Sequence, residues 1–213
     1  MAPRGPVFQG FEDNGEGYIN IYTSWYNQGA NVPPGSPVIA IGQPVAQIYL
    51  HSDTITLNYA VGAGTGSRVQ SFTLKMDGQT TLIDGTNLVN GQTINLLTKL
   101  TIGEHTFSID AVNNFGNPTT KSVKFAIVVT DASIGNDVTQ FVATGKITQN
   151  EGKSLLSKLV TAAKARAKGN CPNAITIYMS FISEVQAQSG KTIDQTAALI
   201  LIADARYLIA HCP

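Results

Sequence analysis

The sequence has little charge, no charge imbalance and no long apolar run. Only 13% of its 213 residues are charged, and fourteen Lys and Arg balance fourteen Asp and Glu. Proteins that bind nucleic acid need clustered basic side chains to neutralise phosphates, so this composition argues against a nucleic-acid partner. The longest apolar stretch, residues 197–203, is far too short to span a bilayer. We therefore expect no nucleic-acid partner and no membrane span.

The first ten residues contain no apolar segment of the kind that a signal peptide needs. Abundant Thr, Asn and Gln are nevertheless typical of exported proteins. We expect a mature fragment, with Met1 and Ala2 as a candidate added start, and a secreted, extracellular or cell-surface location.

The segment from about residue 145 to the end has a helical apolar pattern. Gly169 and Gly190 divide it where glycine commonly ends a helix. Within each part, apolar residues recur every three or four positions and so share one helix face. The three runs are Leu155, Leu156, Leu159, Val160 and Ala163; Ile175, Tyr178, Phe181, Ile182 and Val185; and Ala197, Ile200, Leu201, Ala205 and Leu208. This pattern predicts a three-helix bundle.

The chain has two cysteines, and both lie in this segment. Cys171 precedes the second predicted helix and Cys212 follows the third. In an antiparallel pair the start of one helix lies beside the end of the next, so a bridge would distort neither helix. Closing a loop of this size would stabilise the fold by about 4 kcal/mol. We expect a Cys171–Cys212 disulfide; the alternative is two reduced thiols, as in a reducing compartment.

Between residues 37 and 131 the apolar pattern changes to a period of two, which is typical of strands. The alternating sets are Val38, Ile39 and Ile41; Ile55, Leu57 and Tyr59; Phe72, Leu74 and Met76; Ile94 and Leu96; Phe107 and Ile109; and Val123, Phe125 and Ile127. Asp77-Gly78 predicts a hairpin-type turn. About seven short strands with regular turns favour an immunoglobulin-like (Ig-like) β-sandwich.

The predicted fold class is therefore a β + α multidomain chain, an Ig-like sandwich followed by a three-helix bundle with one disulfide. Its parts are an N-terminal arm over residues 1–36, the sandwich over 37–131 and the bundle over 132–213. We expect a hinge at residues 131–136, where Ser133 would cap a short helix through Phe141.

Two parts of the chain resemble known modules. Residues 181–193 and 201–205 resemble a small helical domain at the end of many secreted bacterial hydrolases and surface proteins. Three stretches resemble the Ig-like repeats of secreted bacterial proteins: Tyr49-Leu50-His51-Ser52-Asp53, Gly103-Glu104-His105-Thr106-Phe107 and residues 110–117. Together the two resemblances cover about residues 38–210. They imply an architecture but no particular activity, because such modules accompany many unrelated catalytic domains.

The N-terminal arm is the candidate contact segment. Residues 18–26 have strand propensity and carry the aromatic side chains of Tyr18, Tyr22, Trp25 and Tyr26. The arm would be the end of a preceding domain lying on the next one, a ligand platform, or a strand donated to a neighbouring subunit. A single strand with unpaired backbone groups must find a partner, and we expect that partner in the same chain.

No motif supports catalysis or a cofactor. The glycine-rich segment 62–66 lacks the following Lys-Ser/Thr and helix of a phosphate loop. The three histidines, His51, His105 and His211, have no Cys, His or Glu at metal-ligand spacing. Residues 110–117 offer oxygen ligands for calcium, but Asx-turn hydrogen bonds explain them as well. We expect no enzyme activity, no cofactor and no metal, and we leave a calcium ion at this turn open.

These features predict a non-catalytic accessory or structural module of a secreted bacterial protein. Its role would be spacing, surface attachment or protein contact, with an upstream catalytic domain, a neighbouring subunit or a cell-surface polymer as partner. One alternative is a subunit of an extracellular filament or oligomer, assembled by N-terminal strand donation. Others are a hydrolase with an unrecognised site and a carbohydrate-binding accessory domain, which would stack sugars on aromatics such as Trp25, Tyr22 or Tyr49.

Overall fold

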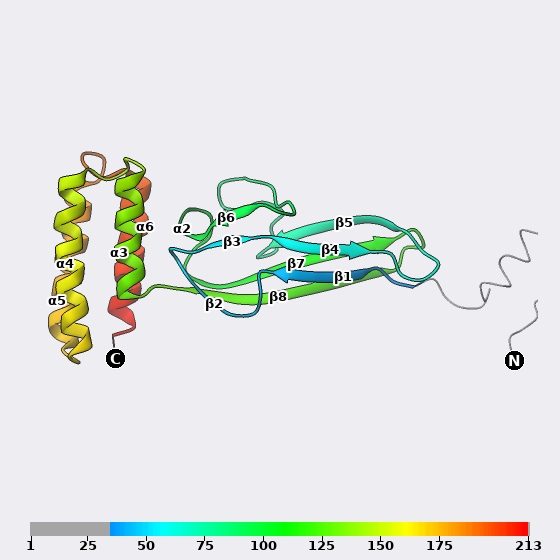
Figure 1. Ribbon diagram of the computed structural model, residues 1–213, viewed down its shortest axis with the longest axis horizontal. Coiled ribbons are helices and arrows are strands. Elements are labelled where there is room, and N and C mark those ends of the chain that lie inside the picture. Colours follow the sequence, from blue (N-terminus) through cyan, green and yellow to red (C-terminus); the bar gives the residue numbers. More distant parts are fainter. Residues whose placement is uncertain (1–34, 213) are drawn as a thin grey trace, which may run out of the picture. The chain divides into compact units, whose positions relative to one another are not determined.

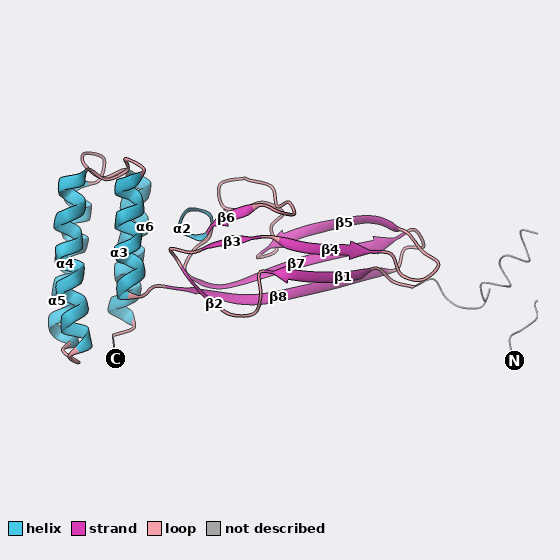
Figure 2. Ribbon diagram, viewed as in Figure 1, coloured by secondary structure: helices cyan, strands magenta, loops and turns pink. Residues whose placement is uncertain are grey.

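The computed structural model describes residues 35–212. The arm residues Tyr18, Tyr22, Trp25 and Tyr26 lie outside this range. Strands occupy the first part of the described chain, and all helices except the short α2 follow them (Figures 1 and 2). Two compact units are present: the smaller contains described residues 35–38, 61–71 and 111–119, and the larger contains Ile39–Ala60, Phe72–Asp110 and Thr120–Pro213.

Within residues 35–212 the strands form three sheets, of two, four and two strands. The four-stranded sheet has the order β2-β8-β7-β5, and β2 runs parallel to β8, with Ile48 opposite Ala126 and Leu50 opposite Val128. The other two sheets pair β1 with β4 and β3 with β6. The strand bounds are β1 (Val38–Gln43), β2 (Ile48–Leu50), β3 (Thr54–Thr56), β4 (Asn58–Gly62), β5 (Val69–Met76), β6 (Thr93–Asn95), β7 (Gly103–Asn113) and β8 (Pro118–Val128).

The period-two pattern predicts most of these strands correctly. Phe107 and Ile109 of β7 and Phe125 and Ile127 of β8 are buried, as their alternation requires. The turn after β5 is confirmed as well: Asp77 and Gly78 both have positive φ, 53° and 81°, as a two-residue hairpin turn demands.

Two strand predictions need correction. Residues 53–61 do not form one strand, because the chain divides at Leu57 into β3 and β4, and the Leu57 N–H donates instead to the Gln92 carbonyl. Leu96 does not continue a strand. It begins the short helix α2 (Leu96–Lys99), whose N-cap Asn95 accepts a hydrogen bond from the Leu97 N–H.

The C-terminal part contains the three helices predicted for the bundle and, before them, a longer version of the short helix expected through Phe141. Their bounds are α3 (Asp131–Ala143), α4 (Gln149–Ala167), α5 (Cys171–Gln188) and α6 (Gln195–Ala210). Residues 131–136, expected as a hinge, are the first turns of α3. Thr130 is the N-cap, and Ser133 completes a capping box with it instead of capping the helix alone. No helix among residues 35–212 is long and apolar enough to cross a membrane.

The helices share one hydrophobic core. Its largest fully buried side chains are Phe141, Tyr178 and Phe181. Leu97 of α2 and Val129, which follows β8, belong to the same cluster. Gly152 lets α3 and α4 approach closely, since a Cβ there would lie 2.4 Å from a Val142 methyl carbon. The helical core is thus closed partly by residues of the strand-rich segment.

Candidate functional site

A buried cluster of one imidazole and two carboxylates is the candidate site. His51 lies in the turn between β2 and β3, Asp137 on α3 and Asp204 on α6. Their exposed fractions are 3%, 0% and 0%. Side chains of this kind are rarely fully buried without a specific partner, so their convergence calls for an explanation.

Local structure fixes each member of the cluster. The His51 N–H donates to the Val128 carbonyl at 2.9 Å, and the Asp53 carboxylate accepts from the Leu50 N–H at 2.8 Å, which holds the turn. Asp137 lies three residues after buried Ile134, and Asp204 lies three residues after buried Leu201. Both aspartates therefore occupy positions on the core-facing stripes of their helices.

The geometry brings the polar atoms within reach of one another. His51 Nδ1 lies 2.7 Å from Asp204 Oδ1, and His51 Nε2 lies 3.4 Å from the Leu100 carbonyl oxygen. One nitrogen or oxygen atom from each of His51, Asp137 and Asp204 lies within 4.8 Å of the others. Both oxygens of Asp137 and Oδ2 of Asp204 have no hydrogen-bond partner among the described residues.

The electrostatics favour a positive species between the carboxylates. Burial, together with the neighbouring carboxylates of Asp204 and Asp53, raises the pKa of Asp137 from 3.8 to about 8. A protonated Asp137 can donate its O–H to Asp204, which also faces the His51 ring. Chemically, the cluster can hold a proton or a cation.

We expect metal-free protein to lose stability as the pH rises from about 4 to about 8. Because the pKa of Asp137 is raised in the folded chain, Asp137 keeps a proton that the unfolded chain releases above pH about 4. The folded state is therefore favoured at low pH, and it loses this advantage as Asp137 ionises. Asp137→Asn preserves the shape without the charge and should flatten the decline.

Urea denaturation in EDTA between about pH 5 and about pH 9 measures this slope. Asp110→Asn is the control, because the Lys75 ammonium holds the pKa of that partly exposed carboxyl below its usual value, outside this pH range. Equal slopes for wild type and Asp137→Asn would contradict the assignment.

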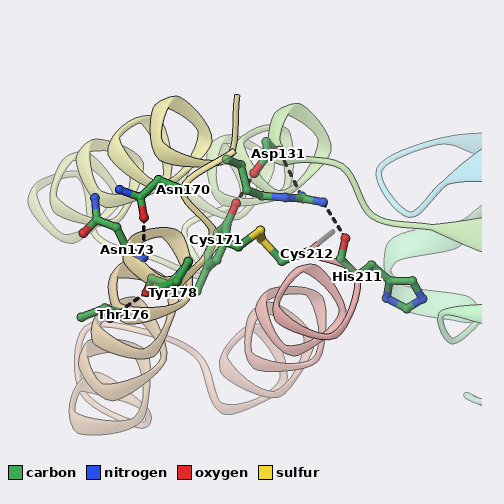
Figure 3. Close-up of a disulfide and its surroundings, with 10 residues drawn as sticks. Asp131, Asn170, Cys171, Asn173, Thr176, Tyr178, His211 and Cys212 are labelled. Atoms are coloured by element: carbon green, nitrogen blue, oxygen red, sulfur yellow. Dashed lines mark hydrogen bonds and ion pairs between the residues drawn. A yellow bond between two sulfur atoms is a disulfide. The ribbon is translucent and has the colours of Figure 1, made fainter. Parts of the chain in front are cut away.

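The predicted disulfide is present. Cys171 and Cys212 are bridged with their Cα atoms 5.9 Å apart, joining the first residue of α5 to the residue that follows the C-cap of α6 (Figure 3). Arg166 lies beside the bridge, donating to Asp131 at 3.1 Å and to the His211 carbonyl at 3.0 Å. The Tyr178 hydroxyl also bonds Asp131, and burial together with that carboxylate holds the Tyr178 pKa well above its usual value.

Other residues considered from the sequence have structural partners. Tyr49 is not an exposed sugar platform: it is buried, its ring packs edge-on against Phe125, and its hydroxyl donates to the Gln43 side chain. His105 is a strand hydrogen bonder, as expected, paired with Asp77 at 2.6 Å and the Thr101 carbonyl at 2.7 Å.

The turn considered for calcium contains Asx hydrogen bonds. The Asn113 side-chain oxygen accepts from the N–H groups of Phe115 and Asn117, both at 2.9 Å. Asn114 accepts from the Arg68 N–H at 2.7 Å. Of the side chains that the sequence offered as calcium ligands, those of Asn113 and Asn114 thus bind backbone N–H groups, and Asp110 binds Lys75 and the Thr120 hydroxyl.

The sequence did not reveal the buried cluster, because its members form no motif and two of them, His51 and Asp204, are 153 residues apart. One signal was present. Asp204 interrupts the apolar run of α6 three residues after Leu201 and four before Leu208, which is a core position. A carboxylate at such a position marks a buried polar contact.

The fold and the site together define a mixed β and α protein with a disulfide-bridged helical part and a buried His–Asp–Asp cluster. The FIMAH domain model matches residues 131–210, which cover α3 to α6. This helical segment is thus similar to FIMAH domains. It contains Asp137, Asp204 and Cys171, whereas His51 lies outside it.

No similar protein was found among the curated proteins. Among solved structures, the crystal structure of CopC from Methylosinus trichosporium OB3b is similar at 14% sequence identity with a TM-score of 0.25. The match covers 44% of this chain and 93% of CopC.

Proposed function

We propose that the chain is a non-catalytic accessory or structural module of a secreted bacterial protein. An Ig-like sandwich carries a disulfide-clipped helical domain, and the pair acts in spacing, surface attachment or contact with other proteins. The Cys171–Cys212 disulfide is the observation that carries this proposal, because such bridges persist in oxidising, extracytoplasmic environments. The similarity of residues 131–210 to a recurrent domain supports the modular role.

The local setting of the bridge supports a structural role for it. Cys171 is buried at the N-terminus of α5, directly before Pro172, and its pairing with Cys212 holds the end of α6. Neither cysteine is free and Cys171 is buried, so the pair lacks the free, exposed thiol that a redox-active cysteine needs. The bridge therefore stabilises the packing of α5 and α6 by holding their ends together.

Export can be tested by producing the chain behind a bacterial signal peptide and, separately, in the cytoplasm. The proposal expects a bridged, protease-resistant protein in the periplasm, and loss of that resistance when Cys171 and Cys212 are both replaced by serine. Equal resistance in both compartments with free thiols would contradict it.

Surface attachment can be tested by cosedimentation of the purified chain with bacterial cell walls, cellulose and chitin. Retention on cell walls alone supports attachment to a surface polymer. Retention on cellulose or chitin, lost when Tyr22 and Trp25 are replaced by alanine, would favour the carbohydrate-binding alternative. Retention on none of the three leaves spacing and protein contact as the proposed roles.

Deleting residues 1–30 tests the alternative of strand donation. We expect light scattering to give a monomeric mass for both the intact and the shortened chain, because the segment 28–36 is long enough to let the arm fold back on its own chain. A higher oligomer that becomes a monomer on deletion would replace same-chain packing with the assembly role.

A further inference from the structure

The buried cluster holds more acidic than basic groups. Two carboxylates are removed from water at Asp137 and Asp204, and among the described residues the His51 ring is the basic group that contacts them. Isolated buried carboxylates are strongly disfavoured unless a cation or a proton neutralises them. Neither oxygen of Asp137 accepts a hydrogen bond from a donor among the described residues, so either a proton shared with Asp204 or a bound cation must neutralise this side chain.

The orientation of His51 allows it to act as a metal ligand. In the tautomer whose Nε2–H donates to the Leu100 carbonyl, 3.4 Å away, the Nδ1 lone pair is directed at the carboxylates. A second hydrogen bond of this kind commonly fixes the tautomer of a ligating histidine. In that tautomer Nδ1 and Asp204 Oδ1 are two acceptors 2.7 Å apart, and a cation between them satisfies both; in the metal-free protein an Nδ1–H donating to Asp204 takes its place, so metal binding displaces that proton.

We propose that His51, Asp137 and Asp204 bind one divalent transition-metal cation, with Zn²⁺ as the representative ion. Their ligand atoms lie within 4.8 Å of one another, and around tetrahedral Zn²⁺ neighbouring ligand atoms are about 3.3 Å apart, so adjustments of about 1 Å complete the site. Two carboxylates neutralise the charge of the ion. An imidazole ligand favours Zn²⁺ over Ca²⁺, which prefers six to eight oxygens.

The ion would fasten three segments that are distant in sequence. The turn after β2 supplies His51, α3 supplies Asp137 and α6 supplies Asp204, and all three belong to the larger compact unit. Three protein ligands leave one position for a water molecule. The burial of all three ligands suits an ion that stabilises the fold rather than one open to substrate.

The test uses the full chain, stripped with EDTA and exchanged into chelator-free buffer. Isothermal titration is expected to show one Zn²⁺ bound per chain, and about 100-fold excess over the dissociation constant should raise the melting temperature by about 5 to 10 °C. Cobalt(II), used in place of zinc, should give the visible absorption bands of a four-coordinate, tetrahedral site. Binding of Ca²⁺ in preference to Zn²⁺, or binding of neither, would overturn the proposal.

Asp137→Asn is the decisive variant, because it removes a ligand and also a buried charge that the metal-free fold does not need. Circular dichroism should show a folded protein, while zinc affinity falls by about 100-fold or more and the rise in melting temperature disappears. His211→Ala and Asp84→Asn remove an exposed imidazole and a partly exposed carboxylate outside the cluster, and both should bind zinc as the wild type does. Undiminished zinc binding by Asp137→Asn would place the ion elsewhere and refute the site.

Discussion

Replacing Cys171 and Cys212 together with serine is expected to lower the free energy of unfolding by about 4 kcal/mol. The bridge spans 41 residues and encloses α5, the following turn and α6, so its loss restores the conformational entropy of a long loop to the unfolded chain. Urea denaturation of both proteins, analysed with a common slope, measures the difference.

Wild-type protein with its disulfide reduced provides the matched control. It should approach the stability of the double serine variant, because both lack the same covalent loop closure. A difference below about 1 kcal/mol between oxidised wild type and the variant would show that the bridge contributes little and that packing alone holds the ends of α5 and α6 together.

Phe181→Ala is expected to destabilise the protein by about 3 to 5 kcal/mol. Phe181 is fully buried in the core of the four helices, where truncation removes apolar contacts and leaves a cavity. Met179 lies two residues earlier on the same helix, α5, and is 54% exposed, so Met179→Ala is the control, with an expected change within about 0.5 kcal/mol. Comparable losses in the two variants would contradict the observed burial of this helix.

Periodicity predicted the last three helices, because each has an apolar stripe, and a glycine follows each of the first two. Leu155, Phe181 and Leu201, one from each stripe, are all fully buried. The disulfide followed from the same pattern. Helix α3 was underestimated: its stripe of Ile134, Val138 and Phe141 is short, and Thr130, which caps it, precedes the segment that was expected to be a hinge.

The pairing of the strands could not be predicted from the sequence, for a physical reason. Ile48–Leu50 is only three residues long, too short to show alternation, yet it forms an edge of the four-stranded sheet by running parallel to β8. That pairing places His51 at the end of a strand, where its N–H bonds Val128. Long-range contacts of this kind depend on the complete fold and not on the residues beside His51.

The buried cluster was missed for the same reason. His51 was judged by its sequence neighbours, but its partners come from α3 and α6. Neither aspartate was singled out from the sequence, because aspartate usually lies at the surface. In this protein, however, Asp137 and Asp204 replace apolar residues on core-facing stripes, and only the folded chain brings them together.

Alkylation of thiols in the native host, followed by intact-mass measurement of the protein, tests the central claim of an exported, disulfide-clipped module most directly. Cells would be quenched with acid and treated with an alkylating reagent under denaturing conditions, with and without prior reduction. We predict no alkyl groups without reduction and two after it, at Cys171 and Cys212. Two alkyl groups without reduction would show that both cysteines are free in the cell and would contradict the claim.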